Sequence, residues 1–404
     1  MISTYAPPRF YNLLEPEMMK RSMRILAPLL LLGFVTSCGN DDPVTEEISV
    51  SSLRLIGQQI LPRRAEFSAT VVGGLSGIDY DAKTDSYFII SDDRTTTDSP
   101  NAPRFYTARL SFDANSFSGL TFQSVVSFKQ PDGTDYPKVP DLKVADPESI
   151  RIDPLNGNLV WASEGDRTLT STPARVINPF IREITKAGQH VREYELPSIF
   201  AMSSSDVGPR GNLTLEGLAF LPDGKSLAAI MEGPLFQDSA TPTLTTGAQS
   251  RITVFDRTSG KATAQYAYPI EKVQAAPVPA DQFTVNGATE ILALSSTRFL
   301  VLERSFSVGV IGNQVRLYEI DISKATNVLT AANLQGATAV TKRLVLDFET
   351  LKTQLGGIAN LEGITFGPRL ANGKRSLVVI ADDNFPLADS ATDRNQVIVF
   401  EVQP

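Results

Sequence analysis

One sequence pattern occurs five times in this chain, and the repeat constrains the fold more than any other feature. Each copy has an apolar segment of about five residues, a polar turn and a second apolar segment. The copies start at Ser76, Glu148, Glu216, Glu290 and Glu362, with spacings of 68 to 74 residues. Turn-forming sequences such as Asp-Pro-Leu-Asn-Gly (153–157) and Pro-Asp-Gly (222–224) lie between the apolar segments. The repeat therefore predicts five β-hairpins whose strands are buried on both faces.

Two more polar, strand-like segments follow each of the first four hairpins. They are 104–112 and 121–128, 174–184 and 190–196, 251–256 and 262–269, and 315–322 and 342–348. Four antiparallel strands in each repeat are typical of a β-propeller blade. The last repeat has only its hairpin and 396–402, and segment 52–61 can supply the missing strand and so remove an exposed sheet edge. We therefore predict an all-β propeller of five four-stranded blades, closed by an N-terminal strand that joins the last blade. Six blades are the alternative.

The N-terminal segment carries an export pattern. Basic residues at 20, 21 and 24 flank the apolar run 25–35, which is too short for a stable membrane anchor and has the form of a signal peptide. Val35-Thr36-Ser37-Cys38 resembles the bacterial lipobox, which implies that Cys38 is acylated. We predict a signal peptide at 1–37, with Met18, Met19 and Met23 as alternative start sites. A lipidated acidic tether at 38–50 and a propeller domain at 51–404 follow. The expected location is outside the cytoplasm, anchored by lipid to the outer membrane or the cell surface.

The composition excludes several classes of function. The net charge is −8 and no basic patch is dense, so we expect no nucleic-acid partner. His190 is the only histidine and Cys38 the only cysteine, which excludes most histidine or thiolate metal sites. We expect a monomer that contacts the membrane only through its lipid and acts on a small molecule.

Acidic residues mark both ends of most hairpins. A hairpin's first strand begins at the end where its second strand stops, so these acids are expected to form two rings at one mouth of the central channel. The pairs are Glu148 and Glu164, Glu216 and Glu232, Glu290 and Glu303, and Glu362 and Asp382, with Asp92 and Asp93 in the first repeat. Arg94, Arg167 and Arg304 lie one to three residues beyond the acids.

So many carboxylates cannot lie close together without compensation, because each raises the pKa of the others. Oxygen ligands favour Ca²⁺, with Mg²⁺ as the alternative. The predicted metal ligands are Asp92, Asp93, Glu148, Glu164, Glu216, Glu232, Glu290, Glu362 and Asp382. The predicted anion-binding residues are Arg94, Arg167 and Arg304, and the predicted catalytic residues are Glu216, Glu303 and Arg304. Alternatively, each Glu accepts backbone hydrogen bonds from the next blade, while Gly217 and Gly363 allow close packing.

Three of these motifs resemble one family. Residues 212–218 (Asn-Leu-Thr-Leu-Glu-Gly-Leu), Leu302-Glu303-Arg304 with Phe306 and Gly309, and 360–364 (Asn-Leu-Glu-Gly-Ile) are similar to the phytase-like domain called "esterase-like activity of phytase". The resemblance covers roughly 73–402. It implies a secreted propeller that hydrolyses phosphoesters or esters. The calcium-dependent propeller phytases hold calcium at an acidic channel mouth and are usually six-bladed.

Three functional hypotheses follow. The first is a metal-dependent phosphoester hydrolase, and the second is a non-catalytic surface propeller that binds a glycan, a polyanion or a protein. The third is a serine esterase, which would need His190 as its base. The chain has no Gly-x-Ser-x-Gly motif, and Ser76 in Gly74-Leu75-Ser76-Gly77 lacks the required spacing. An exposed strand position is the expected setting of His190.

Overall fold

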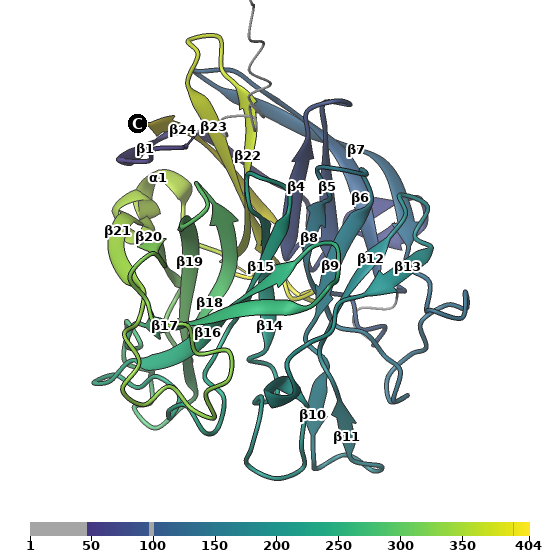
Figure 1. Cartoon of the computed structure of the whole chain (residues 1–404). Coiled ribbons are helices and arrows are strands. Elements are labelled where there is room, and N and C mark those ends of the chain that lie inside the picture. Colours follow the sequence, from purple (N-terminus) through teal and green to yellow (C-terminus); the bar gives the residue numbers. More distant parts are fainter. Residues whose placement is uncertain (1–46, 97–100, 391) are drawn as a thin grey trace, which may run out of the picture. The chain divides into compact units, whose positions relative to one another are not determined.

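The computed structural model describes residues 47–96, 101–390 and 392–404 (Figure 1). The predicted signal peptide, Cys38 and most of the predicted tether lie outside these residues. In the part of the chain that is described, no helix is long and apolar enough to cross a membrane.

Five four-stranded antiparallel sheets form the blades. Blade 1 is β4 (Gly77–Asp81), β5 (Ser86–Ser91), β6 (Arg104–Phe112) and β7 (Phe117–Ser127), and blade 2 is β8 (Pro147–Ile152), β9 (Leu159–Ser163), β12 (Phe180–Ile184) and β13 (His190–Glu193). Blade 3 is β14 (Leu215–Phe220), β15 (Ser226–Met231), β16 (Ala248–Asp256) and β17 (Ala262–Ile270). Blade 4 is β18 (Thr284–Ala293), β19 (Arg298–Ser307), β20 (Gln314–Asp321) and β21 (Thr341–Asp347). The first strands contact one another in the order β4, β8, β14, β18, β22 and back to β4, so they surround a central channel.

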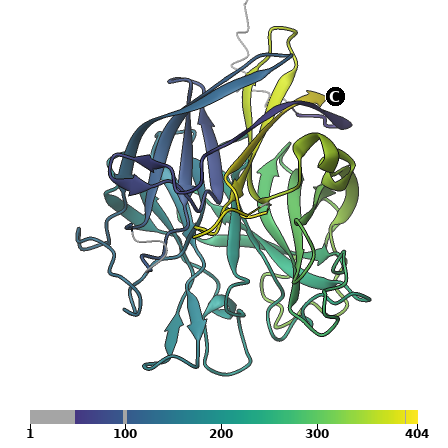
Figure 2. The same cartoon turned by 180° about the vertical axis from the view of Figure 1, so that it is seen from behind.

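Blade 5 closes the ring with strands from both ends of the described chain. It consists of β22 (Asn360–Arg369), β23 (Arg375–Asp382), β24 (Gln396–Gln403) and β1 (Ser52–Ile60). β1 pairs antiparallel with β24 from Ser52 opposite Gln403 to Ile60 opposite Gln396, and the two strands lie side by side in Figures 1 and 2. The five-bladed propeller and its closure by an N-terminal strand are therefore confirmed.

The prediction of a single strand at 174–184 is wrong, because two separate strands cover this segment. β11 (Arg175–Ile177) pairs with β10 (Asp166–Thr168) in a small ribbon outside the blade, and only β12 joins the sheet. Asn178-Pro179 separates them, and proline has no N–H to donate to a sheet. A second small ribbon, β2 (Glu66–Phe67) with β3 (Thr70–Val71), precedes blade 1, and a 3₁₀ turn with the short helix α1 (Lys352–Leu355) precedes blade 5.

Apolar side chains from neighbouring blades pack against each other and hold the ring together. Between blades 1 and 2, the ring of Trp161 stacks on Phe128 with centroids 4.4 Å apart and meets Phe180 edge-on. Between blades 4 and 5, Leu300 and Leu377 belong to one buried cluster. This packing orients the first strands and therefore fixes the side chains at the channel mouth.

Candidate functional site

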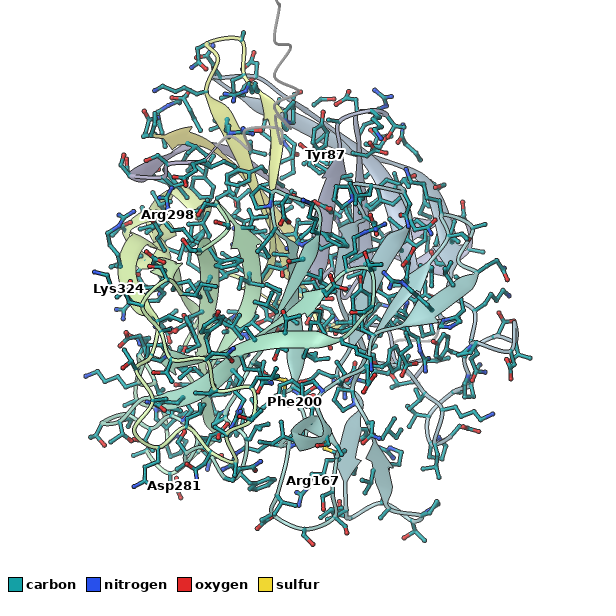
Figure 3. All side chains as sticks on the ribbon, viewed as in Figure 1. Tyr87, Arg167, Phe200, Asp281, Arg298 and Lys324 are labelled. Atoms are coloured by element: carbon teal, nitrogen blue, oxygen red, sulfur yellow. The ribbon has the colours of Figure 1, made fainter. Side chains whose placement is uncertain are left out.

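A pocket of about 540 Å³ lies at the mouth of the channel where the first strands begin. In Figure 3, Arg167 and Asp281 mark loops at this end of the propeller, and Tyr87 lies toward the opposite end. Seven carboxylates of the two predicted rings line the pocket: Asp92, Glu148, Glu164, Glu216, Glu232, Glu362 and Asp382. An eighth lining carboxylate, Asp393, comes from the loop between β23 and β24. Arg94 and Arg304 are the only cationic side chains among the described lining residues. The predicted convergence of acids is thus present for these seven residues.

A β-bulge at the start of the first strands aims the inner carboxylates. In β14 the register skips Glu216, and in β22 it skips Glu362, so each is the extra residue of its strand. The register of β8 shifts in the same place, at Glu148. Bulges commonly re-aim a side chain next to a functional site. The carboxylates of the second ring, Asp92, Glu164, Glu232 and Asp382, lie at or just after the ends of the second strands.

Blade 4 departs from this pattern by one residue. Its bulge leaves out Thr289, not Glu290, and Glu303 lies opposite Ala288. Arg304 therefore occupies the position that Glu232 and Asp382 occupy in blades 3 and 5. Because side chains alternate between the two faces of a strand, this shift turns Glu303 away from the pocket.

Glu303 has a buried environment of its own. Its carboxylate accepts hydrogen bonds from Lys342 Nζ at 2.5 Å and from the Tyr268 hydroxyl at 2.7 Å. It is not among the lining residues of the pocket, whereas Arg304 is. Arg304 Nη2 lies 3.1 Å from Glu362 Oε1 and 3.4 Å from Glu232 Oε1. The structure thus brings Arg304 and Glu216 into the pocket and leaves Glu303 outside it.

Glu290 lies deeper, on the channel axis. Its position corresponds to Gly217 in blade 3, where an added Cβ would meet Glu290 Oε1 at 2.8 Å. The missing side chain therefore makes room for Glu290. Its carboxylate pairs with Arg151 at 2.7 Å and accepts hydrogen bonds from Ser149 Oγ and Leu218 N.

Arg151 connects the five first strands below the pocket. It comes from β8, and its guanidinium donates to one backbone carbonyl of each of the other four: Ile78, Leu218, Ile291 and Ile364. Glu290 and Arg151 form a buried ion pair whose donors and acceptors are used within the protein. Burial raises the pKa of Glu290, and the Arg151 guanidinium opposes this rise.

Two other predicted site residues also lie apart from the pocket lining. Asp93 is fully buried and pairs with buried Arg104 at 2.8 Å. Arg167 pairs with Asp206 at 3.0 Å and lies over the ring of Phe236. The lining includes Asp92, the neighbour of Asp93, because adjacent strand residues face opposite sides.

Three residues that were not predicted as site residues contact the charged groups of the pocket. Asp146, two residues before Glu148, binds Arg94 Nε at 2.5 Å. Asn212 accepts a hydrogen bond from Arg94 Nη2 at 2.7 Å, and Asn360 donates to Glu362 and Asp382. The alternation Asp146-Pro147-Glu148 at the start of a first strand is a signal that could have identified Asp146, because it puts two acids on one face.

The ring carboxylates of the pocket, and Asp146 next to them, carry raised pKa values. Burial, followed by repulsion from Glu232 and Glu164, holds the pKa of Glu216 well above its ordinary value. Burial and repulsion from Asp382 raise the pKa of Glu362 to about 8, and burial raises the pKa of Asp146 to about 6. Two arginines do not compensate for this concentration of negative charge.

Two groups of carboxylates have the spacing that a metal ion needs. Ligand oxygens of Asp146, Glu148 and Glu164 lie within 4.8 Å of one another, and so do those of Glu164, Glu216 and Glu232. Glu164 belongs to both groups. Asp146 Oδ2 is buried and has no hydrogen-bond partner within the described chain, which is unfavourable unless a ligand approaches it. The all-oxygen donor set fits a hard divalent cation.

The residues of the serine esterase hypothesis do not meet at this site. Ser76 is buried, and its hydroxyl donates to the carbonyl of Pro147. His190 begins the outermost strand of blade 2 and is partly exposed. Ser76, by contrast, lies at the start of an innermost strand, so these two residues form no catalytic pair.

Comparison with known protein families gives one match. The model described as "Phytase-like: Esterase-like activity of phytase" matches residues 70–385. This range includes the seven ring carboxylates of the pocket and both of its arginines. No curated protein matches the sequence significantly.

Several solved structures resemble the chain weakly. The endo-arabinase of Bacteroides thetaiotaomicron has a TM-score of 0.42 at 10% identity, over 82% of this chain and 95% of that one. A protein of unknown function from Dyadobacter fermentans has a TM-score of 0.41 at 10% identity, over 88% and 100% of the two chains. The periplasmic gluconolactonase of Pseudomonas aeruginosa has a TM-score of 0.34 at 13% identity, over 83% and 90%. At these scores, the structures carry no argument about function.

Proposed function

Because the chain belongs to the phytase-like family described as "esterase-like activity of phytase", we propose that it is a hydrolase of phosphomonoesters that depends on a divalent cation. The observation that carries this proposal is the pair of three-carboxylate groups joined at Glu164. Ca²⁺ is the proposed ion and Mg²⁺ the alternative, since both prefer oxygen ligands. Asp146, Glu148, Glu164, Glu216 and Glu232 would hold it. A bound divalent cation compensates negative charge on phosphoryl oxygens and lowers the pKa of bound water.

The two arginines of the pocket are suited to orient a phosphoryl group. Arg94 and Arg304 approach from blades 1 and 4, and both already contact carboxylates that would also bind the cation. Arg304 Nε has no hydrogen-bond partner among the described residues. Guanidinium groups bind phosphate through parallel hydrogen bonds, so we assign these residues to substrate orientation.

Glu362 is the proposed proton donor to the leaving oxygen. With its pKa near 8 it is largely protonated at neutral pH. Its Oε1 accepts hydrogen bonds from Arg304 Nη2 and Asn360 Nδ2, so the proton belongs on Oε2. A neutral carboxyl next to the leaving oxygen can supply the proton that the departing alkoxide needs.

Phosphate release is the test. Purified protein would be assayed with phenyl phosphate, glycerol phosphate and phytate, first with a chelator and then with added Ca²⁺ or Mg²⁺. We expect activity only with the cation, and a loss of about 100-fold or more in kcat for Glu164→Gln. Glu195→Gln is the matched control, because this side chain is 70% exposed. Absence of turnover on every substrate would exclude catalysis and favour the non-catalytic binding propeller.

Export and lipid anchoring are a separate proposal. We propose that Cys38 is acylated and that the protein is a monomer held at the outer membrane or the cell surface. The motif Val35-Thr36-Ser37-Cys38 supports this. Cys38→Ala should move the protein from the membrane fraction to the soluble fraction and abolish labelling by a clickable fatty acid. An unchanged fraction and unchanged labelling would contradict it.

A further inference from the structure

The wall of the pocket formed by blade 4 carries the aromatic rings of the described lining and no carboxylate, in contrast to the acidic walls of the other blades. β18 and β19 contain ten residues each, whereas β14 and β15 contain six, so the blade 4 hairpin extends beyond the acidic residues. Phe283 and Phe306 line the pocket on this extension, with ring centroids 6.4 Å apart. Phe283 is 64% exposed although it is large and apolar.

Two further exposed apolar side chains lie in the loops that adjoin Phe283 and Phe306 in the sequence. Val278 and Ile311 are 65% and 75% exposed. Backbone hydrogen bonds from Val308 N to Phe283 O and from Val278 N to Val308 O hold these loops side by side. Exposed apolar groups that adjoin a polar pocket are a common feature of binding sites.

The charges of the pocket limit how many anionic groups can enter. Apart from the proposed cation, only Arg94 and Arg304 supply positive charge, among the described lining residues. Any further anionic group of the same ligand would meet carboxylates on one side or phenyl rings on the other. A substrate with a single anionic group and an apolar body can place the anionic group near the arginines and the apolar body against the phenyl rings.

We propose that the substrate is an amphiphilic phosphomonoester, whose phosphoryl group faces the acidic residues and whose aryl or alkyl body packs on Phe283 and Phe306. The identity of the reacting group rests on the proposed function, whereas the apolar subsite can be measured without catalysis. A substrate with an aromatic body should bind most tightly, because its ring can stack on the exposed ring of Phe283. An inositol polyphosphate is disfavoured because its phosphates surround the ring.

Calorimetric titration with two non-hydrolysable phosphonates tests the subsite. Full-length protein with saturating Ca²⁺ would be titrated with phenylphosphonate and with methylphosphonate, which share the anionic group. We expect phenylphosphonate to bind about tenfold more tightly. Phe283→Ala should abolish this preference and leave the binding of methylphosphonate unchanged.

Leu155→Ala is the matched control. Leu155 is 62% exposed but lies on the hairpin turn between β8 and β9, at the opposite end of the channel. The Leu155→Ala variant should still bind phenylphosphonate more tightly than methylphosphonate. Equal binding of the two phosphonates, binding of neither, or a preference that survives Phe283→Ala would overturn the subsite even if phosphate release is observed. Preference without hydrolysis of phenyl phosphate would instead retain the subsite and reject the proposed function.

Discussion

Two charged clusters lie along the same channel, and they differ in how their charges are balanced. On the axis, Arg151 pairs with Glu290 and donates to carbonyls of the other four first strands, so its hydrogen-bonding groups are used within the protein. At the mouth, the seven ring carboxylates face two arginines, and their pKa values are raised. The axis cluster therefore connects the five first strands, whereas the negative charge of the mouth cluster is not balanced within the described residues.

The largest predicted effect comes from breaking the axis cluster. Arg151→Met leaves Glu290 buried without its cation and removes donors from four carbonyls. We expect a loss of about 3–5 kcal/mol in the free energy of unfolding, measured by chemical denaturation. Ca²⁺ should not restore it, since Glu290 is outside the pocket. A loss below about 1 kcal/mol would contradict the role of the axis cluster.

The second effect is stabilisation of the mouth by its ion. At a free Ca²⁺ concentration of 100 times the dissociation constant, the free energy of unfolding should rise by about 2.7 kcal/mol. Glu164→Gln should remove most of this gain, because Glu164 belongs to both carboxylate groups. Glu195→Gln should retain it. Equal stabilisation of the two variants would place the ion elsewhere.

The third effect is on the pH dependence of stability without metal. The pKa of Glu362 is about 8 and that of Asp146 about 6, above their ordinary values of 4.5 and 3.8. The folded state therefore binds more protons than the unfolded state, and stability decreases as the pH rises from about 5 to 8. Saturating Ca²⁺ should diminish the decrease. Denaturation curves at pH 5 and pH 8 check this, and rising metal-free stability would contradict it.

The smallest predicted effect is a gain in stability when one substitution at the mouth reduces the repulsion between carboxylates. Glu216→Gln removes a carboxylate whose pKa is raised by burial and then by Glu232 and Glu164. With a chelator, the variant should be more stable than the wild type by up to about 1 kcal/mol. With Ca²⁺ the order should reverse, because a ligand is lost. A thermal shift assay under both conditions distinguishes this from a simple packing change.

The fold could be predicted because its signals are local and repeated. Five apolar hairpins, three of them with Asn-Gly or Asp-Gly turns, imply five blades, and the unpartnered segment 52–61 implies closure by β1. The break at Asn178-Pro179 was missed because the residues on both sides favour strands. The carboxylate convergence followed from hairpin geometry alone, since a first strand begins where its partner ends.

In blade 4, the predicted site residues differ by one position from the residues that line the pocket. Glu290 and Glu303 match the acidic pattern by type, but the bulge at Thr289 shifts the register and brings Arg304 into the pocket. A spacing of 74 residues from Glu216 to Glu290, followed by 72 to Glu362, hinted at this shift. Asp146 and Asn212 come from loops whose paths depend on tertiary packing, so the repeat did not reveal them.

We propose that the mouth cluster binds a divalent cation and that the axis cluster does not. A crystal structure of the protein soaked in Ca²⁺, and a second in Mn²⁺ for its anomalous signal, tests it most directly. We expect ion density within about 2.3–2.6 Å of Glu164 oxygens for Ca²⁺, shared with Glu216 and Glu232 or with Asp146 and Glu148. Density restricted to other surfaces, or none at millimolar Ca²⁺, would contradict it.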